Sequence, residues 1–418
     1  MIAFALAVTT AAASAADLAS IVLVLLAATL GALLSRIHGR VVLPTVVIEI
    51  VLGILIGPQV LDFAKSDPYL NFLANLGLGF LFFIAGLEVI DKKVPRRQLQ
   101  IGSIGWAVSL VIALGVGLGL QEAGVDARWW LLGVALSTTA LGTLVPIVVD
   151  AGLLTTRLGS AVLGTGVAGE FWPIVVISIF LTGVYGALGE ILLLIAFCGI
   201  VACAAAVMLR ARPPRVVKAI QETVHTTGQA AVRGAILILA ALVYLAVESG
   251  FDFVLGAFAA GLVVGLALDS PEGEDVRIRL EGIAFGVFIP IYFVVTGMTF
   301  DVDSLLTGGG LALAAVFLGL FLLTRGSSAL LWRRELGDQR TAGLAFFAAT
   351  GLPLIVAVVS IGEGRGAIDS SVGASLIGAG MLSVLIYPLV AIRLVGRRDP
   401  ETDKGKEEFG EFAEEFLG

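Results

Sequence analysis

Residues 131–150 read LLGVALSTTALGTLVPIVVD, and residues 341–362 read TAGLAFFAATGLPLIVAVVSIG. Each stretch is long enough to cross a bilayer, since a spanning helix needs roughly 20 apolar residues. Each is also interrupted by small, polar or helix-breaking residues. These are Ser137, Thr138, Thr139, Gly142, Thr143 and Pro146 in the first stretch, and Thr350, Gly351 and Pro353 in the second. The two stretches predict a pair of broken membrane helices of the kind that forms transport sites. Unwound carbonyls and hydroxyls can ligate a cation there, and the expected ligands are Ser137, Thr138, Thr139, Thr143, Thr350 and Gly351.

The composition of the whole chain indicates a membrane protein. Of its 418 residues, 58% are apolar and 14% are charged, and the mean hydropathy is +1.03. A soluble domain averages about 45–50% apolar and about 25% charged residues. Continuous apolar blocks exclude a transmembrane barrel, whose strands alternate polar and apolar residues. The sequence has no stripe of basic residues, so nucleic acid is not expected as a partner. We therefore predict an all-α polytopic protein whose main partner is the lipid bilayer.

Apolar blocks number thirteen along the chain. They lie near residues 18–34, 41–57, 70–88, 101–120, 129–149, 158–182, 190–209, 232–247, 254–268, 282–299, 310–332, 341–361 and 371–396. Lys and Arg favour cytoplasmic loops. With the N-terminus outside, 22 of the 26 Lys and Arg residues fall on the cytoplasmic side and 3 fall outside. This asymmetry predicts thirteen spans in the cell membrane, with the C-terminus in the cytoplasm.

Three regions are expected: an external N-terminus or signal peptide at 1–17, a membrane domain at 18–396 and an acidic cytoplasmic tail at 397–418. Within the membrane domain, a link at 190–231 separates the halves 18–182 and 232–396. The link holds the seventh span and a polar, surface-lying helix. A single span, the seventh, lies between two sets of six helices. Each helix of the second set therefore runs in the direction opposite to its counterpart in the first set, and the fifth and twelfth spans are such counterparts. The sequence predicts two inverted repeats with paired broken helices.

Three charged residues lie deep in predicted spans: Glu49, Glu170 and Arg325. A charge at mid-bilayer costs at least ~2.5–3.5 kcal/mol, so it faces a cavity or a partner. Glu170 is about twelve residues from the cytoplasmic start of its helix, or ~18 Å, which is too deep to reach the surface. Arg325 stays protonated, so we expect Glu170 or Glu49 to neutralise it. Glu88 lies near a helix end, and we expect it to reach the headgroups.

The residues around Glu170 read GTGVAGEFWP. Small residues such as Gly166 and Gly169 allow another backbone to approach closely. Pro173 has no N–H and leaves the carbonyl of Gly169 without its helical donor. This environment favours a functional role for Glu170, with the glycines and the proline as packing or hinge positions.

Five segments resemble the second monovalent cation:proton antiporter family. They are Pro44–Pro58 (PTVVIEIVLGILIGP), Phe80–Val89 (FLFFIAGLEV), Ala135–Gly142 (ALSTTALG), Leu255–Gly265 (LGAFAAGLVVG) and Phe288–Asp303 (FIPIYFVVTGMTFDVD). The resemblance covers essentially the whole membrane part in order. It implies a homodimer that exchanges Na⁺ or K⁺ for protons by alternating access, with no cofactor and no metal beyond the transported cation.

The resemblance also implies roles for single residues. The family's sixth helix carries a carboxylate that binds cation and proton alternately, and Glu170 matches it. The basic residue that neutralises the crossing of the broken helices matches Arg325, and Thr138 and Thr139 match the polar segment of the break. Gly169 stands where relatives carry a second polar or acidic residue. Because Gly169 cannot titrate and Arg325 does not release a proton, we expect electroneutral exchange.

Other functions remain open from the residues alone. The chain could be an anion or organic-solute carrier of the same architecture, in which Arg325 binds a substrate carboxylate. It could also be a cation channel or sensor whose broken helices line a pore. An enzyme is not expected, because no hydrolase or metalloprotease motif is present.

Overall fold

The computed structural model describes residues 15–37, 44–89, 94–154, 156–180, 199, 229–268, 271–306 and 309–395. Within these ranges, the regular structure is helical apart from an isolated β-bridge between Ala127 and Ile368. The helices are α2 (Ala15–Ile37), α3 (Thr45–Ile56), α4 (Pro68–Val89), α5 (Arg96–Glu122), α6 (Trp129–Leu136), α7 (Leu141–Asp150), α8 (Arg157–Phe180), α11 (Ala230–Glu248), α12 (Phe253–Ala267), α13 (Pro271–Ile283), the π-helical turn η1 (Ala284–Phe288), α14 (Ile289–Thr299), α15 (Val302–Leu306), α16 (Gly310–Thr324), the 3₁₀ turn η2 (Gly326–Trp332), α17 (Arg333–Ala348), α18 (Pro353–Gly364) and α19 (Ser370–Val395).

The all-helical prediction is confirmed. In the part of the chain that the structure describes, eight helices are long and apolar enough to cross a membrane, and three shorter apolar helices accompany them. Each predicted block except 190–209 overlaps a described helix or pair of helices. Four predicted features lie outside the described residues: the seventh span apart from residue 199, the polar insertion up to residue 228, the suggested signal peptide up to residue 14 and the acidic tail.

Both predicted interruptions are real breaks. The fifth block becomes α6 and α7, separated by residues 137–140, and the twelfth becomes α17 and α18, separated by residues 349–352. The eleventh block is not one uniform helix, because the α-helix α16 ends at Thr324 and the tighter turn η2 follows Arg325. The tenth begins earlier than predicted, since α13, η1 and α14 form one helical run.

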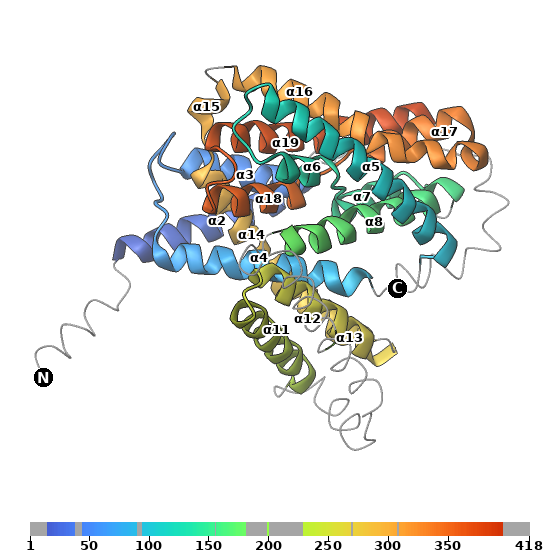
Figure 1. Cartoon of the computed structure of the whole chain (residues 1–418). Coiled ribbons are helices and arrows are strands. Elements are labelled where there is room, and N and C mark those ends of the chain that lie inside the picture. Colours follow the sequence, from blue (N-terminus) through green and yellow to red (C-terminus); the bar gives the residue numbers. More distant parts are fainter. Residues whose placement is uncertain are drawn as a thin grey trace, which may run out of the picture.

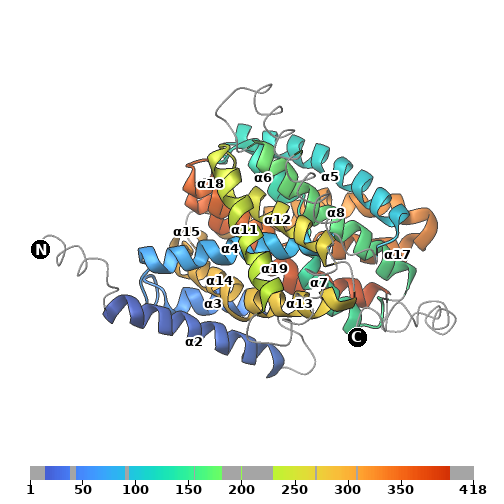
Figure 2. The same ribbon diagram turned by 90° about the horizontal axis from the view of Figure 1, so that it is seen from below.

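The helices pack into two bundles. We call α2, α3, α4, α11, α12, α13, η1 and α14 the wall bundle. We call α5, α6, α7, α8, α16, η2, α17, α18 and α19 the crossing bundle, because it contains both broken helices. Figure 1 shows α5, α16 and α17 on one side of the molecule and α11, α12 and α13 on the other, and Figure 2 shows α2 at an outer edge beside α3 and α14. Contacts between the bundles run mainly through α8, which touches α4 and α12.

Glycine pairs set the spacing inside the wall bundle. A Cβ added at Gly297 of α14 would lie 2.9 Å from the Cα of Gly53 on α3. A Cβ at Gly261 of α12 would lie 2.8 Å from the Cα of Gly86 on α4. Both distances are too short for a side chain, so the backbones touch, as small residues allow in membrane helices. This packing fixes the wall bundle as a compact unit.

The outer faces of the helices are apolar. Val22 on α2, Val111 on α5 and Leu237 on α11 are each about two-thirds exposed, at 64%, 70% and 69%. Soluble proteins rarely expose such continuous apolar surface, whereas lipid-facing helices require it. The chain is therefore a multi-pass membrane protein.

Candidate functional site

The two helix breaks cross each other. The N–H of Ala140 donates to the carbonyl of Thr350 at 2.9 Å, and the hydroxyl of Thr139 donates to the carbonyl of Ala348 at 2.6 Å. A helix break leaves backbone groups without intrahelical partners, and here each break supplies partners for the other. The C-terminal ends of α6 and α17, which carry partial negative charge, meet at this crossing.

Arg325 supplies the positive charge at the crossing. Its side chain is completely buried. Its Nε donates to the Thr139 hydroxyl at 2.7 Å, its Nη2 to the carbonyl of Thr165 at 2.9 Å and its Nη1 to the hydroxyl of Ser109 at 3.4 Å. The neighbouring Thr324 hydroxyl donates to the carbonyl of Leu136, the last residue of α6, at 2.7 Å. The guanidinium thus joins α5, α8 and the fifth-span break and offsets the partial charges there.

The expected ion pair between Arg325 and Glu170 or Glu49 is not formed. Among the described residues, the polar partners of the guanidinium are hydroxyls and a backbone carbonyl. The physical reason is that broken helices expose carbonyl oxygens and dipole ends inside the protein, and these stabilise a buried cation without a carboxylate.

Gly169 accommodates this arrangement. Its carbonyl, which Pro173 leaves without a helical donor, accepts the N–H of Thr139 at 2.9 Å, while α8 continues through Pro173. A Cβ at position 169 would lie 2.7 Å from the Thr139 hydroxyl and would collide with Nη2 of Arg325. The guanidinium therefore occupies the space that a side chain at position 169 would need.

We expect Gly169→Ala to lower the stability of the protein. The added methyl group must displace a buried, hydrogen-bonded guanidinium or the fifth-span break, and overpacking of this kind costs about 1–3 kcal/mol. The melting temperature of the solubilised protein measures this effect. Gly319→Ala on α16 is the matched control, because a Cβ there meets nothing within 4 Å. A Gly169→Ala protein that is as stable as the Gly319→Ala protein would contradict the packing argument.

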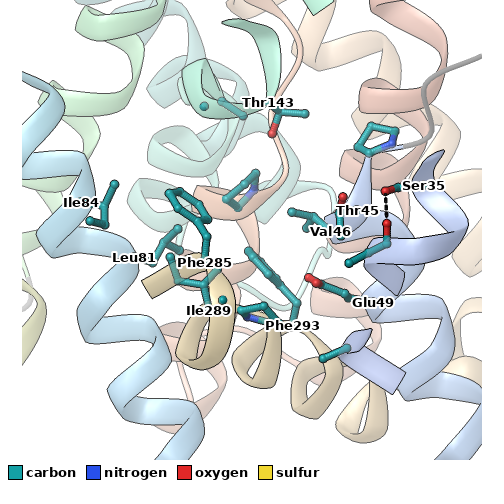
Figure 3. Close-up of a pocket in the computed structure, with 18 of the residues that line it drawn as sticks. Ser35, Thr45, Val46, Glu49, Leu81, Ile84, Thr143, Phe285, Ile289 and Phe293 are labelled. Atoms are coloured by element: carbon teal, nitrogen blue, oxygen red, sulfur yellow. Dashed lines mark hydrogen bonds between the residues drawn. The ribbon is translucent and has the colours of Figure 1, made fainter. Parts of the chain in front are cut away.

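A cavity of about 1040 Å³ lies between the two bundles. The wall bundle lines it with residues of α2, α3, α4, η1 and α14, and the crossing bundle lines it with residues of α7, α8 and α18. Figure 3 shows this cavity, with Glu49 and Thr45 on one side, Ile84 and Leu81 on another, and Phe285 and Phe293 between them. The described lining residues include Glu49, Glu88 and Glu170 but neither Lys nor Arg. Such a cavity concentrates cations and repels anions.

Glu170 lies on the crossing-bundle side of this cavity. It shares the cavity with Glu88 of α4 and with Gly142 and Thr143 in the first turn of α7. The positive end of α7 favours a negative charge, whereas a second carboxylate disfavours it. A carboxylate that is subject to both effects, from the helix end and from the second carboxylate, can hold either a proton or a cation.

The predicted site residues separate into two groups. Glu49, Glu170 and Thr143 line the cavity. Ser137, Thr138, Thr139, Thr350 and Gly351 are buried at the crossing and do not line it. The hydroxyls of Ser137 and Thr138 donate to carbonyls of α6 at 2.9 Å.

Gly166 is a packing position, since a Cβ there would lie 2.6 Å from Cδ1 of Leu141. The side chain of Pro146 lies outside the described residues.

Sequence reasoning missed part of the cavity. Glu88 was expected to reach the headgroups, but it lines the cavity with Glu170. Glu88 lies next to the last residue of α4, Val89, as the sequence indicated, but a cavity at that end of the helix cannot be located from the position of a residue along its helix. Phe285 of η1 and Phe293 of α14 also line the cavity and carried no signal beyond their place in an apolar block.

Comparison with known proteins gives a consistent picture. The family described as "Sodium/hydrogen exchanger, transmembrane" matches residues 3–395. The chain is 27% identical over 407 residues to YjbQ of Bacillus subtilis, whose name assigns it as a candidate Na⁺/H⁺ antiporter, covering 93% of this chain and 65% of YjbQ. It is 25% identical over 287 residues to the Na⁺/H⁺–K⁺ antiporter GerN of Bacillus cereus, covering 68% of this chain and 72% of GerN. The chain spans about a third to two thirds of the length of the first curated relatives it matches.

A solved structure has the same fold. The sodium/proton antiporter MjNhaP1 of Methanocaldococcus jannaschii superposes with a TM-score of 0.64 at 18% sequence identity. The superposition covers 90% of this chain and 95% of MjNhaP1. At this identity the likeness concerns the fold alone.

Proposed function

Because the chain belongs to the sodium/hydrogen exchanger transmembrane family, we propose that it exchanges a monovalent cation for protons across the cell membrane. One observation carries the proposal: the cavity beside the crossing of the two broken helices is lined by three carboxylates, one of them Glu170, and its described lining includes no cationic side chain. A secondary transporter needs a site that holds a cation or a proton at mid-membrane depth, and Glu170 fits that requirement.

The position of Arg325 argues against an anion carrier. An anion carrier needs a cationic group that substrate can reach, but Arg325 is fully buried, hydrogen-bonded to the crossing and absent from the cavity lining. We therefore assign Arg325 a supporting role in the crossing bundle. The names of the relatives make Na⁺ and K⁺ the candidate substrates.

Alternating access is the transport mechanism that we propose. The cavity is lined by Ser35 near the end of α2, Thr45 at the start of α3 and Glu88 near the end of α4. The charge asymmetry of the loops predicts that these helix ends are cytoplasmic. With the N-terminus outside and the C-terminus in the cytoplasm, the cavity would open inward, and we propose that the structure represents this inward-open state.

Contacts at the opposite end support this assignment. Arg365, which follows α18 of the crossing bundle, donates to Asp252 at the start of α12 of the wall bundle at 2.8 Å. The Ser370 hydroxyl lies 3.5 Å from a carboxylate oxygen of Asp301, which follows α14. These contacts join the two bundles on the side away from the cavity. Movement of one bundle against the other would break them and open the outer side.

We also propose the homodimer that the family resemblance implies, which a mass measurement on the solubilised protein tests.

We expect the exchange to be electroneutral. Glu170 can alternate between one proton and one monovalent cation, while Gly169 has no titrating group and Arg325 keeps its charge. Each cycle then carries one charge in each direction. In proteoliposomes with an imposed potassium/valinomycin potential, the rate of Na⁺/H⁺ exchange should not change with voltage. An exchange rate or end-point that follows the voltage would show that a second transported charge exists.

A further inference from the structure

Glu49 is a buried carboxylate that the exchange cycle above does not use. It lies in the first half of α3 on the wall bundle, and only 3% of its surface is exposed. α2 packs directly against its side chain, because a Cβ at Gly31 would lie 3.0 Å from Cγ of Glu49. Figure 3 shows its carboxylate directed into the cavity, with Thr45 and Phe293 nearby.

The carboxylate of Glu49 has no protein partner among the residues that the structure describes. Neither a hydrogen bond nor an ion pair joins it to them, and its oxygens are not sealed inside the protein, because the side chain lines the cavity. The helices packed against it, α2 and α14, bring no charged side chain to the cavity, and the other carboxylates there are Glu88 and Glu170. A carboxylate in this environment requires a proton or a cation from the cavity.

Neutral oxygen atoms surround the same side of the cavity. Thr29 and Ser35 of α2 and Thr45 of α3 all line it. The hydroxyls of Thr29 and Ser35 donate to carbonyls of their own helix at 2.8 Å, which leaves their oxygen lone pairs free to accept. Hydroxyls beside a carboxylate form an oxygen-rich environment that suits a hard cation.

We propose that Glu49 is a loading site, which binds the monovalent cation on the cavity wall before the cation moves to Glu170. This inference rests on the proposed function, in which the crossing bundle moves against the wall bundle. Glu49 belongs to the wall bundle, which does not carry ions across the membrane in this mechanism. An ion or proton bound to Glu49 is therefore released to the side from which it came. Glu49 therefore raises the affinity for the cation without adding a transported charge, which keeps the exchange electroneutral.

Transport kinetics test the loading site. In proteoliposomes, Glu49→Gln should raise the half-saturating Na⁺ concentration about tenfold, a loss that corresponds to one weakened ionic contact, while the maximal rate stays close to that of the wild type. Glu49→Asp keeps the charge and should fall between the two. Glu122→Gln is the matched control, because it makes the same chemical change at an exposed position at the end of α5. An unchanged half-saturating concentration in Glu49→Gln would overturn the proposal, as would a response to voltage in this variant that differs from that of the wild type.

Binding without transport separates the loading site from the exchange cycle. A bound cation stabilises the folded protein by an amount that increases with the logarithm of its affinity once the site is saturated, so Na⁺ in place of choline at constant ionic strength should raise the melting temperature of the solubilised protein. Glu170→Gln should retain part of this rise, and the Glu49→Gln/Glu170→Gln double variant should lose it. Equal rises in the single Glu170→Gln and the double variant would exclude cation binding at Glu49. A wild-type protein that exchanges no cation would refute the proposed function but leave this binding measurement valid.

Discussion

Replacing Glu170 by glutamine is expected to abolish cation-driven proton movement while the protein stays folded. Glutamine has nearly the same shape but neither releases a proton nor carries a negative charge. Glu170 lies on the crossing-bundle side of the cavity, which also contains the first turn of α7, and the positive end of that helix favours a negative charge. Without that charge, a cation has no counter-ion at the step that carries it across the membrane. The rate should fall to that of protein-free liposomes.

The measurement is exchange in proteoliposomes with a pH-sensitive dye and successive pulses of Na⁺, K⁺ and Li⁺. Glu170→Asp, which keeps the carboxylate, should retain a fraction of the rate. Glu122→Gln should behave like the wild type, because it removes a carboxylate that is exposed to solvent. An unchanged melting temperature in Glu170→Gln would show that the loss is not caused by unfolding. Wild-type rates in this variant would remove Glu170 from the exchange mechanism.

The broken helices could be predicted from the sequence because their cause is local. Ser, Thr, Gly and Pro compete with or interrupt helical hydrogen bonds, and they concentrate at Ser137–Ala140 and Ala349–Leu352, where the helices break. The same local argument identified the free carbonyl of Gly169. Its acceptor role toward Thr139 could not be predicted, because the partner comes from another helix.

The partners of Arg325 show where sequence reasoning fails. A sequence displays its charged side chains, so Glu170 and Glu49 were the visible candidates for neutralising a buried guanidinium. Backbone carbonyls are present at every residue, and only the tertiary structure shows which of them lack a donor. Here the carbonyl of Thr165 and the hydroxyls of Thr139 and Ser109 bind Arg325. The carboxylates therefore remain available to the cavity.

The division into bundles is also a tertiary property. The predicted halves, 18–182 and 232–396, follow the order of the chain, and each contributes helices to both bundles. The wall bundle combines α2, α3 and α4 with α11, α12 and α14. Hydropathy gives the helices but not their neighbours, so a cavity between the bundles could not be derived from it. For this reason the place of Glu88 in the cavity could not be predicted.

Replacing Arg325 by alanine should destabilise the protein severely. The substitution removes three hydrogen bonds, empties the volume of a fully buried side chain and leaves the ends of α6 and α17 without a countercharge. The expected loss is on the order of 3 kcal/mol or more. Lysine at this position keeps the charge and one strong donor but not the planar fork of arginine. Arg325→Lys should therefore retain partial exchange activity and an intermediate melting temperature.

The control for this prediction is Arg333→Ala, at the start of α17. Arg333 also forms an ion pair, with Asp338 at 2.6 Å, but both side chains are more than half exposed. Exposed pairs contribute little to stability, so this variant should melt close to the wild type. If Arg325→Ala melts at the same temperature as Arg333→Ala, the guanidinium does not stabilise the crossing of the helix breaks. If Arg325→Ala is destabilised and Arg325→Lys restores stability without exchange, the bidentate geometry toward Thr139 and Thr165, rather than the charge alone, is what transport requires.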